Sequence, residues 1–216
     1  MEVKVKIVEE LKIKQIDYTT AMNVIIEKHY LHRKCPCSLA FGLFCNNDKL
    51  VGIIVFGKPA SYTLCEGIAG KEESKNVIEC NRLWVDDKMP KNTESWFMSR
   101  AIKLCPFEII ISFADTEQNH VGYIYQALNW FYCGKSKKQK YFRLKNSSEN
   151  IGGTKYRRRE RMAKSKIIEL YGKEFVEEYY SSLKYRYIYF NCNRKRKKEL
   201  LKKLKYSIKP YPKELF

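Results

Sequence analysis

The chain has 216 residues, 44% of them hydrophobic and 14% aromatic, which is enough to bury one sizeable core. This composition excludes a disordered tail, and no apolar run approaches the length of a membrane span. The first ten residues alternate Val and Ile with Lys and Glu, unlike the apolar stretch of a secretory signal. We therefore expect a soluble, cytoplasmic protein with no membrane partner.

The net charge of +18 is unevenly distributed along the chain. Residues 1–134 hold 16 basic and 16 acidic residues, whereas residues 135–216 hold 26 basic and 8 acidic residues. A general preference for lysine on solvated surfaces would have charged both stretches alike. The excess therefore predicts a polyanionic partner for the second stretch.

The eight cysteines are scattered, mostly within apolar runs, and lack the dense spacing of a secreted disulfide scaffold. We expect reduced thiols. Only Cys35 and Cys37 form a close pair, and one C-x-C pair without a second pair downstream is weak evidence for zinc.

The hydrophobic pattern predicts the secondary structure of the first part of the chain. Alternation predicts a strand at residues 3–13, and helical spacing predicts a helix at residues 19–30. Strands at 39–45 and 49–56 flank a short Asn- and Asp-containing turn, as in a hairpin. Residues 60–75 contain glycines and several charges, so we expect an exposed loop there.

Strands and helices alternate in the remainder. The expected strands are 77–85, 107–113, 141–144 and 185–190, and the expected helices are 93–104 and 122–132. A polar and basic insertion, which we expect to be helical, separates the last two strands.

The element order β-α-β-β-β-α-β-α-β, with an apolar central hairpin, is similar to that of GNAT-like acyltransferases. We expect an α/β (α+β) fold with a central mixed sheet flanked by helices. Residues 1–144 would form the catalytic core, and residues 145–184 the basic insertion. Residues 185–216 would supply the last strand and a basic tail that complete the same domain.

Three segments resemble a known family. The segment from Glu79 reads E-C-N-R-L-W-V-D-D-K-M-P-K-N-T-E-S, Ser112 begins S-F-A-D, and His120 begins H-V-G-Y-I-Y-Q-A-L-N-W. The third segment, R-Y-I-Y-F, begins at Arg186 ahead of the basic tail. Together they resemble the Mom DNA-modification proteins of phages. The insertion is not part of the matched pattern.

The resemblance implies a GNAT-related fold and a transferase activity. Its substrate would be double-stranded phage DNA in the host cytoplasm. The adenine N6 amino group would become a methylcarbamoyl-type adduct, which protects the DNA from restriction.

Carboxylates at strand ends are the catalytic candidates. Glu79 and Asn81 lie two apart on a predicted strand and should face the same side, and Asp115 ends the next strand. An adenine amine that attacks a donor must lose a proton, and a carboxylate in a partly desolvated cleft can take it. A strand-edge ion pair for Glu79 and a helix cap for Asp115 are the structural alternatives. The matched motif adds Ser95.

The turn at residues 86–95 is the expected donor site. Acetyl-CoA enzymes of this fold place Gly-x-Gly there for close approach to phosphate, but this turn has no glycine and several acidic residues. We therefore discount acetyl-CoA and expect a reshaped donor pocket for an unknown donor. Tyr125 and Asn129, one helical turn apart, would line it, with core packing as the alternative for Tyr125. The expected cofactor-binding residues are Asn92, Thr93, Glu94, Tyr125 and Asn129.

The three histidines of the chain fall near these motifs. With one carboxylate they could supply a two-His, one-carboxylate iron site. The predicted ligands are His29, His32, His120 and Asp115. The alternative is that His29 and His32 are ordinary surface residues after the first helix.

The basic stretch interleaves aromatic residues with charge, a pattern that suits DNA because charge follows phosphates and aromatic rings stack on bases. Modification of a paired adenine also favours base flipping. The predicted DNA-binding residues are Arg82, Lys155, Arg157, Arg158, Arg159, Arg186, Arg194 and Arg196.

Two other functions remain open at this point. One is an acyl-CoA-dependent N-acyltransferase for a small molecule or a protein, with a basic tail that serves localisation. The other is a non-catalytic DNA-binding protein, which would not need carboxylates clustered at strand ends.

Overall fold

The computed structural model describes residues 11–46, 48–138, 140–145, 150–153 and 164–213. The chain divides into two compact units. The first, which we call the sheet unit, comprises Met1–Phe113, Gly122–Gly134 and Arg186–Lys213. The second, the insertion unit, comprises Ala114–Val121, Lys135–Tyr185 and Glu214–Phe216.

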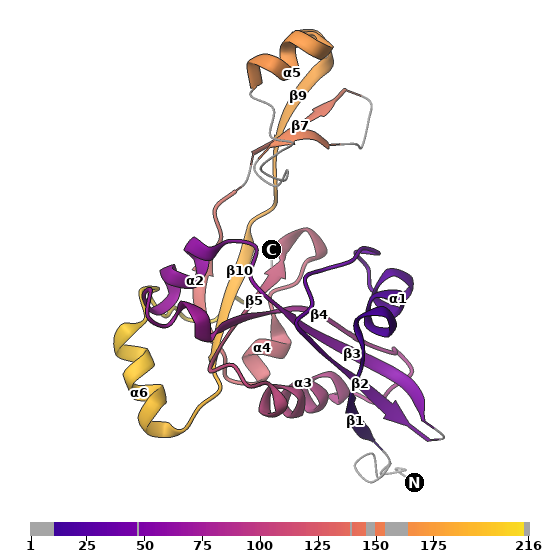
Figure 1. The fold of residues 1–216 in the computed structure, drawn as a ribbon, viewed down its shortest axis with the longest axis vertical. Helices are drawn as coiled ribbons and strands as arrows, with labels where there is room; N and C mark the ends of the chain where they lie inside the picture. The colour runs from indigo at the N-terminus through magenta and orange to yellow at the C-terminus, as the bar shows by residue number, and fades with distance from the viewer. Residues whose placement is uncertain (1–10, 47, 139, 146–149, 154–163, 214–216) are drawn as a thin grey trace. The chain divides into compact units, whose positions relative to one another are not determined.

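A seven-stranded mixed sheet runs in the order β1-β2-β3-β4-β5-β10-β6 (Figure 1). Strands β1 to β4 pair antiparallel, and β4 pairs parallel with β5. The strands are β1 Lys12–Gln15, β2 Leu39–Cys45, β3 Lys49–Gly57, β4 Val77–Val85, β5 Ile109–Asp115, β6 Phe131–Lys135 and β10 Lys184–Phe190.

Helices pack against this sheet, which confirms the expected α/β class with a central mixed sheet flanked by helices. Asp17 caps the first helix, because its carboxylate accepts a 3.0 Å hydrogen bond from the Thr20 backbone N–H. The helices of the sheet unit are α1 Tyr18–Lys28, α2 Tyr62–Ala69, α3 Thr93–Leu104, α4 Tyr123–Ala127 and α6 Arg194–Lys203.

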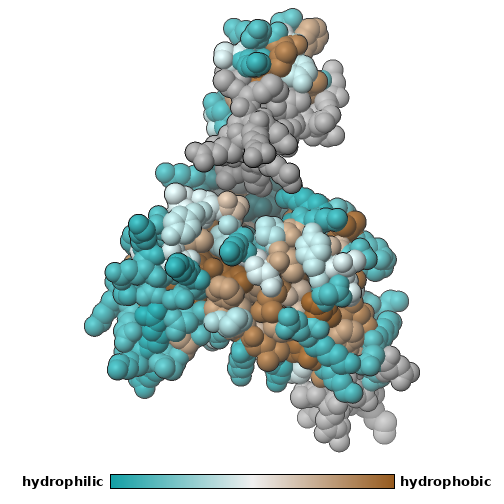
Figure 2. Space-filling model, viewed as in Figure 1, coloured by the Kyte–Doolittle hydropathy of each residue, from teal (hydrophilic) through white to brown (hydrophobic). Residues whose placement is uncertain are grey.

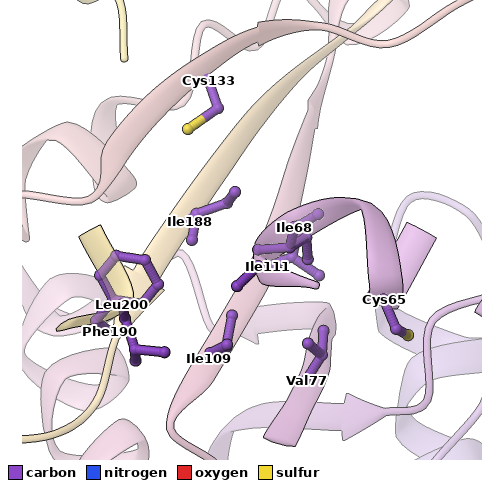
Figure 3. Close-up of a cluster of buried hydrophobic side chains, with 10 residues drawn as sticks. Cys65, Ile68, Val77, Ile109, Ile111, Cys133, Ile188, Phe190 and Leu200 are labelled. Carbon is purple, nitrogen blue, oxygen red and sulfur yellow. The ribbon is translucent and has the colours of Figure 1, made fainter. Parts of the chain in front are cut away.

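One buried cluster joins α2 and α6 to the strands beneath them (Figure 3). Ile109 and Ile111 alternate along β5 and therefore point to this side of the sheet, where they meet Ile68 of α2 and Leu200 of α6. A second cluster packs Met22 of α1 against β2 and β3. The two clusters hold α1, α2 and α6 on the sheet by burial of apolar side chains.

The loop expected at residues 60–75 was wrong, because α2 lies within it. Its buried residues Cys65, Ile68 and Ala69 follow helical spacing. Gly70, at φ +101°, ends the helix, so one of the glycines taken as a loop signal is a helix terminator.

The helix expected at residues 122–132 was also wrong in length. Helix α4 ends at Ala127, Asn129 adopts a positive φ of 56°, and β6 begins at Phe131. A left-handed asparagine turns the chain out of the helix, and the apolar residues that follow join the sheet. The first strand, expected at 3–13, is β1 at Lys12–Gln15; residues 1–10 lie outside the described residues.

The insertion, which we expected to be helical, contains both helix and strand among its described residues. Its strands pair in the order β8-β7-β9, and α5 Lys164–Tyr171 is its α-helix among the described residues. Tyr141 pairs with Tyr179 across the strands, with stacked rings 5.3 Å apart. Such cross-strand aromatic pairs stabilise strands, a signal hidden by the basic composition. The strands are β7 Lys140–Leu144, β8 Asn150–Gly153 and β9 Val176–Tyr180.

All eight cysteines are free. Across the described ranges, no helix has both the length and the apolar character needed to cross a membrane.

A buried carboxylate anchors α6 to the rest of the sheet unit. Glu73 is 3% exposed, and its two oxygens accept hydrogen bonds from Arg196 at 2.5 Å, Lys203 at 2.6 Å and Asn76 at 3.0 Å. Arg196 also donates to Glu108 at 2.9 Å. Burial opposes ionisation of Glu73, but these donors outweigh it and lower its pKa from 4.5 to about 2.

We expect Glu73→Gln to lower the free energy of unfolding at pH 7 by about 3 kcal/mol. Because folding lowers this pKa, the contribution is fully present above pH 4.5 and is lost as pH falls toward 2. Urea unfolding of both proteins between pH 7 and pH 3 would therefore show their difference narrowing.

The control is Glu72→Gln, whose side chain is 89% exposed and lies 3.8 Å from Lys203. It should change stability by less than about 0.5 kcal/mol. A Glu73 effect that stays constant with pH would contradict the ion-pair explanation.

Candidate functional site

The candidate site is built on β4, where the strand is irregular. Val55 of β3 pairs with Arg82 and Phe56 pairs with Cys80, so Asn81 is the extra residue of a bulge. A bulge breaks the regular alternation of faces, so spacing alone does not give the side on which Asn81 lies. A Cβ on Gly57, the partner of Glu79, would lie 2.5 Å from the Asn81 amide nitrogen, so the amide lies on the side of the sheet that Glu79 faces.

Asn81 contacts the segment between α1 and β2. Its side-chain amide donates a 2.7 Å hydrogen bond to the Pro36 carbonyl oxygen. Gly57, the partner of Glu79 on β3, allows this approach, because a Cβ there would lie 2.1 Å from that oxygen and 2.5 Å from the Asn81 amide nitrogen. Gly57 and Asn81 thus hold the Cys35–Cys37 segment against β3 and β4, the second of which carries Glu79.

A hydrogen-bond chain lies beside this point. Ser112 Oγ on β5 donates to the Cys80 carbonyl oxygen at 2.8 Å and lies 2.7 Å from the Tyr125 hydroxyl. A serine has one hydroxyl proton, so the Tyr125 phenol donates to Ser112. The ring of Tyr125 also stacks on Tyr187 at 4.9 Å. Tyr125 therefore combines packing with a fixed phenol direction.

The charge of Glu79 affects the pKa values of two buried groups, Tyr125 and Cys35. Burial is the main cause that raises the pKa of the Tyr125 phenol, and the charge of Glu79 raises it further. Burial likewise raises the pKa of the Cys35 thiol to about 11, with Arg82 opposing and Glu79 reinforcing the shift. Both groups therefore stay protonated at neutral pH.

Arg82 is partly buried, and its charge interacts with that of Glu79. Its Nη1 donates to the Asn81 carbonyl oxygen at 2.6 Å, while its Nε is buried without a hydrogen-bond acceptor among the described residues. Burial lowers its pKa, and the charge of Glu79 partly offsets this effect. A guanidinium with an unsatisfied N–H is suited to an acceptor oxygen of a bound molecule.

The predicted donor turn leads from β4 into α3. Asn92 stands before the helix at φ 72°, so asparagine adopts the left-handed conformation for which glycine is the usual residue. Thr93 is buried and donates to the Pro90 carbonyl oxygen at 2.7 Å, and Ser95 donates to that of Asn92 at 3.0 Å. Both hydroxyls therefore support the turn, while Glu94 is exposed.

Asn129, the other predicted donor-pocket residue, lies in the exposed turn after α4. Because α4 ends at Ala127, Asn129 does not share a helical face with Tyr125.

Asp115 belongs to the insertion unit and is 7% exposed. Its carboxylate accepts hydrogen bonds from Lys184 at 2.7 Å, Ser182 at 2.9 Å and the Glu117 backbone N–H at 3.2 Å. Burial opposes ionisation, but the bonds from Lys184 and Ser182 outweigh it and lower the pKa of Asp115. A carboxylate with a lowered pKa is a weak base, and its three hydrogen bonds join Asp115 to Ser182, Lys184 and Glu117.

The predicted iron ligands are divided between the two units, with His29 and His32 in the sheet unit and Asp115 and His120 in the insertion unit. His29 is buried, and its Nδ1 accepts a 3.1 Å bond from the Leu31 backbone N–H. Within the described ranges, no three or more His, Cys, Asp or Glu side chains form a group that could hold a metal ion.

The predicted DNA-binding arginines occupy different surroundings. Arg186 packs its guanidinium 4.1 Å from the Tyr206 ring, and Arg196 is bound by Glu73, so with the partly buried Arg82 three of them have partners within the protein. Arg194 is exposed. Lys155, Arg157, Arg158 and Arg159 lie outside the described residues.

Sequence reasoning missed four residues of these surroundings: Gly57, Ser112, Ser182 and Lys184. Ser112 stood inside a matched motif, which was a usable signal. The other three act through contacts between segments far apart in the chain, which no local pattern reveals.

We expect Gly57→Ala to destabilise the protein by about 1–3 kcal/mol, because the added methyl group must displace Pro36. Displacement of this segment should also speed alkylation of Cys35 by iodoacetamide at pH 7.5, measured by peptide mass spectrometry. The control is Gly67→Ala on α2, where the nearest atom to a Cβ is the Tyr206 hydroxyl at 3.4 Å. Equal effects of both changes would contradict the close approach at Gly57.

Known proteins are similar to this chain in sequence. A model of the Mom protein family matches residues 10–213. Over 132 residues the chain is 32% identical to the methylcarbamoylase mom of Escherichia phage Mu. That match covers 58% of this chain and 54% of the phage Mu protein, about half its length.

Solved acetyltransferase structures are also similar. An N-acetyltransferase from Staphylococcus aureus has 12% identity and a TM-score of 0.46, over 84% of this chain and 99% of that one. Spermidine N-acetyltransferase from Vibrio cholerae has 8% identity and a TM-score of 0.46, over 84% and 94% of the two chains. Because the family model spans residues 10–213, the chain belongs to the Mom protein family.

Proposed function

We propose that this protein is a DNA-modifying transferase that converts the adenine N6 amino group to a methylcarbamoyl-type adduct and so protects DNA from restriction. The observation that carries the proposal is the match to the Mom family over residues 10–213. The phage Mu relative is named a methylcarbamoylase. The excess of basic residues after residue 134 supports a polyanionic substrate.

In the proposed reaction, the adenine N6 nitrogen attacks the carbonyl carbon of a donor. A new N–C bond forms, the leaving group of the donor departs, and one N6 proton passes to Glu79. Glu79 suits this role because it is partly buried and its neighbours Cys35 and Tyr125 keep their protons.

Arg82 and Tyr125 would orient and stabilise the reacting groups. The guanidinium of partly buried Arg82 can stabilise the donor carbonyl oxygen, on which negative charge develops during attack. The phenol proton of Tyr125 is already directed to Ser112, so we assign Tyr125 a positioning role. Asn81 would position the site through its bond to Pro36.

The donor would bind near Asn92, Thr93, Glu94 and Ser95. The exposed carboxylate of Glu94 disfavours a phosphate group at this turn, which supports the discounting of acetyl-CoA. For Asp115 we propose a supporting role: its bonds to Ser182, Lys184 and Glu117 hold the residues that follow β5. Access to a paired adenine would require the base to leave the duplex.

The test is the DNA of cells that express the protein. We expect this DNA to resist restriction enzymes that are sensitive to adenine modification, and its nucleosides to contain a modified adenosine by mass spectrometry. Glu79→Gln should abolish the modified nucleoside while thermal unfolding stays within a few degrees of the parent. Unmodified nucleosides with the folded parent protein would contradict the proposal and favour an N-acyltransferase of small molecules or proteins.

Asp115→Asn is the matched comparison for Glu79→Gln. We expect its melting temperature to fall, because Lys184 loses a charged partner that is 7% exposed. Activity per folded molecule should remain above that of Glu79→Gln. A stable but inactive Asp115→Asn would instead restore Asp115 as a catalytic group.

We also propose, from the sequence alone, that the protein binds iron. Purified protein is expected to carry iron below one ion per chain, measured by plasma mass spectrometry, and to lose iron and activity together on chelation. His29→Ala and His120→Ala should have the same effect. Full adenine modification by a metal-free preparation supplied with an acyl-CoA would contradict this proposal and support ordinary acyl transfer.

A further inference from the structure

We propose that helix α6 binds the phosphate backbone of duplex DNA through one face, formed by Arg194, Lys195, Lys198 and Lys202. We call these four residues the outer basic face. The inference rests on the proposed function, because it takes DNA as the substrate, and it deepens that function by naming a surface that holds the duplex.

Helix geometry groups these four residues. At 100° per residue, Arg194, Lys198 and Lys202 follow one another at four-residue steps, and Lys195 lies beside them, so all four fall within an arc of about 100°. Each of them is exposed. With a rise of 1.5 Å per residue the row is about 12 Å long. The helix therefore presents a straight line of positive charge.

The opposite face of α6 is turned to the protein. Leu200 is fully buried, and Arg196 and Lys203 are bound by the 3% exposed carboxylate of Glu73. Lys197 lies 5.0 Å from the centre of the Phe131 ring. The basic residues of α6 thus divide into those that anchor the helix and those that are left for a partner.

The described residues of the protein do not neutralise the outer basic face. None of its four residues forms an ion pair or a side-chain hydrogen bond with another described residue. The acidic residue of α6, Glu199, lies at the edge of this face and forms its ion pair with Arg196, at 3.6 Å. Figure 2 shows hydrophilic side chains gathered over the region of α6 at the left of the view. Four adjacent uncompensated charges on a helix held by a buried ion pair favour a polyanion over a solvated surface.

The chemistry of this face favours a phosphate backbone over base edges. It carries no aromatic side chain that could stack on bases, and three of its four residues are lysines, which bind phosphate as point charges. Lysine and arginine that contact phosphates release counterions, which makes binding sensitive to salt and largely independent of sequence. We infer that α6 supplies general affinity for the duplex, separately from the chemistry near Glu79.

The test compares two fourfold variants of the full chain. In the first, Arg194, Lys195, Lys198 and Lys202 are changed to Gln, which keeps helix propensity. The control changes Lys12, Lys49, Lys58 and Lys103 to Gln, which removes the same charge from exposed positions elsewhere on the sheet unit. Binding to an unmodified, fluorescein-labelled duplex is measured by anisotropy between 50 and 300 mM NaCl, with circular dichroism as the check on folding.

We expect the α6 variant to bind the duplex more weakly and to flatten the slope of log affinity against log salt by up to about 3.6, or about 0.9 for each lost phosphate contact. The control variant should keep the slope of the parent. An unchanged slope in the α6 variant, or an equal loss in both variants, would overturn the proposal. So would displacement of the duplex by polyglutamate at equal charge concentration, since that result identifies an acidic protein as the partner.

Nucleoside analysis of DNA from cells that express the parent protein separates this inference from the proposed function. If adenine is modified but the salt slope does not depend on α6, only the inference fails. If the slope depends on α6 but no modified base is found, the proposed reaction fails and α6 remains a DNA-binding helix.

Discussion

The ion pairing of the buried Glu73 carboxylate with Arg196 and Lys203 is the interaction on which the sheet unit depends most. Glu73 lies four residues before β4 and bonds to Arg196 and Lys203, more than 120 positions later in the chain. A buried charge of this kind is tolerated only when several donors satisfy it. One group therefore fixes both the start of the strand that carries Glu79 and the orientation of the basic helix α6.

The site depends on a second constraint, the space that Gly57 leaves for the Pro36 carbonyl. Asn81, at the bulge of β4, binds the segment before β2 through its hydrogen bond to the Pro36 carbonyl oxygen. On the other side, β4 pairs with β5 only from Val77 to Glu79, so Glu79 stands where the parallel ladder ends. Ligands commonly bind where neighbouring strands of such sheets part, because backbone and side-chain groups become accessible there.

Basic residues of this protein perform different tasks, although the sequence presents them as one class. Arg82 is partly buried and its charge interacts with that of Glu79, Arg196 neutralises Glu73, and Arg186 packs on Tyr206. Only the exposed residues remain for a polyanion. The count of 42 basic residues therefore overstates the positive surface available to a partner, because some of these residues are used inside the protein.

The sequence by itself determined the α/β class, the central hairpin and the family, because apolar periodicity and long motifs are local features that survive without knowledge of the fold. It failed where distant segments decide the structure. Gly70 was expected in a loop, but its positive φ ends α2. Asn129 was expected in a helix, but its positive φ turns the chain out of α4. Only the tertiary structure decided that Asp115 is paired with Lys184 and that Arg196 is an anchor, because both partners come from remote positions in the chain.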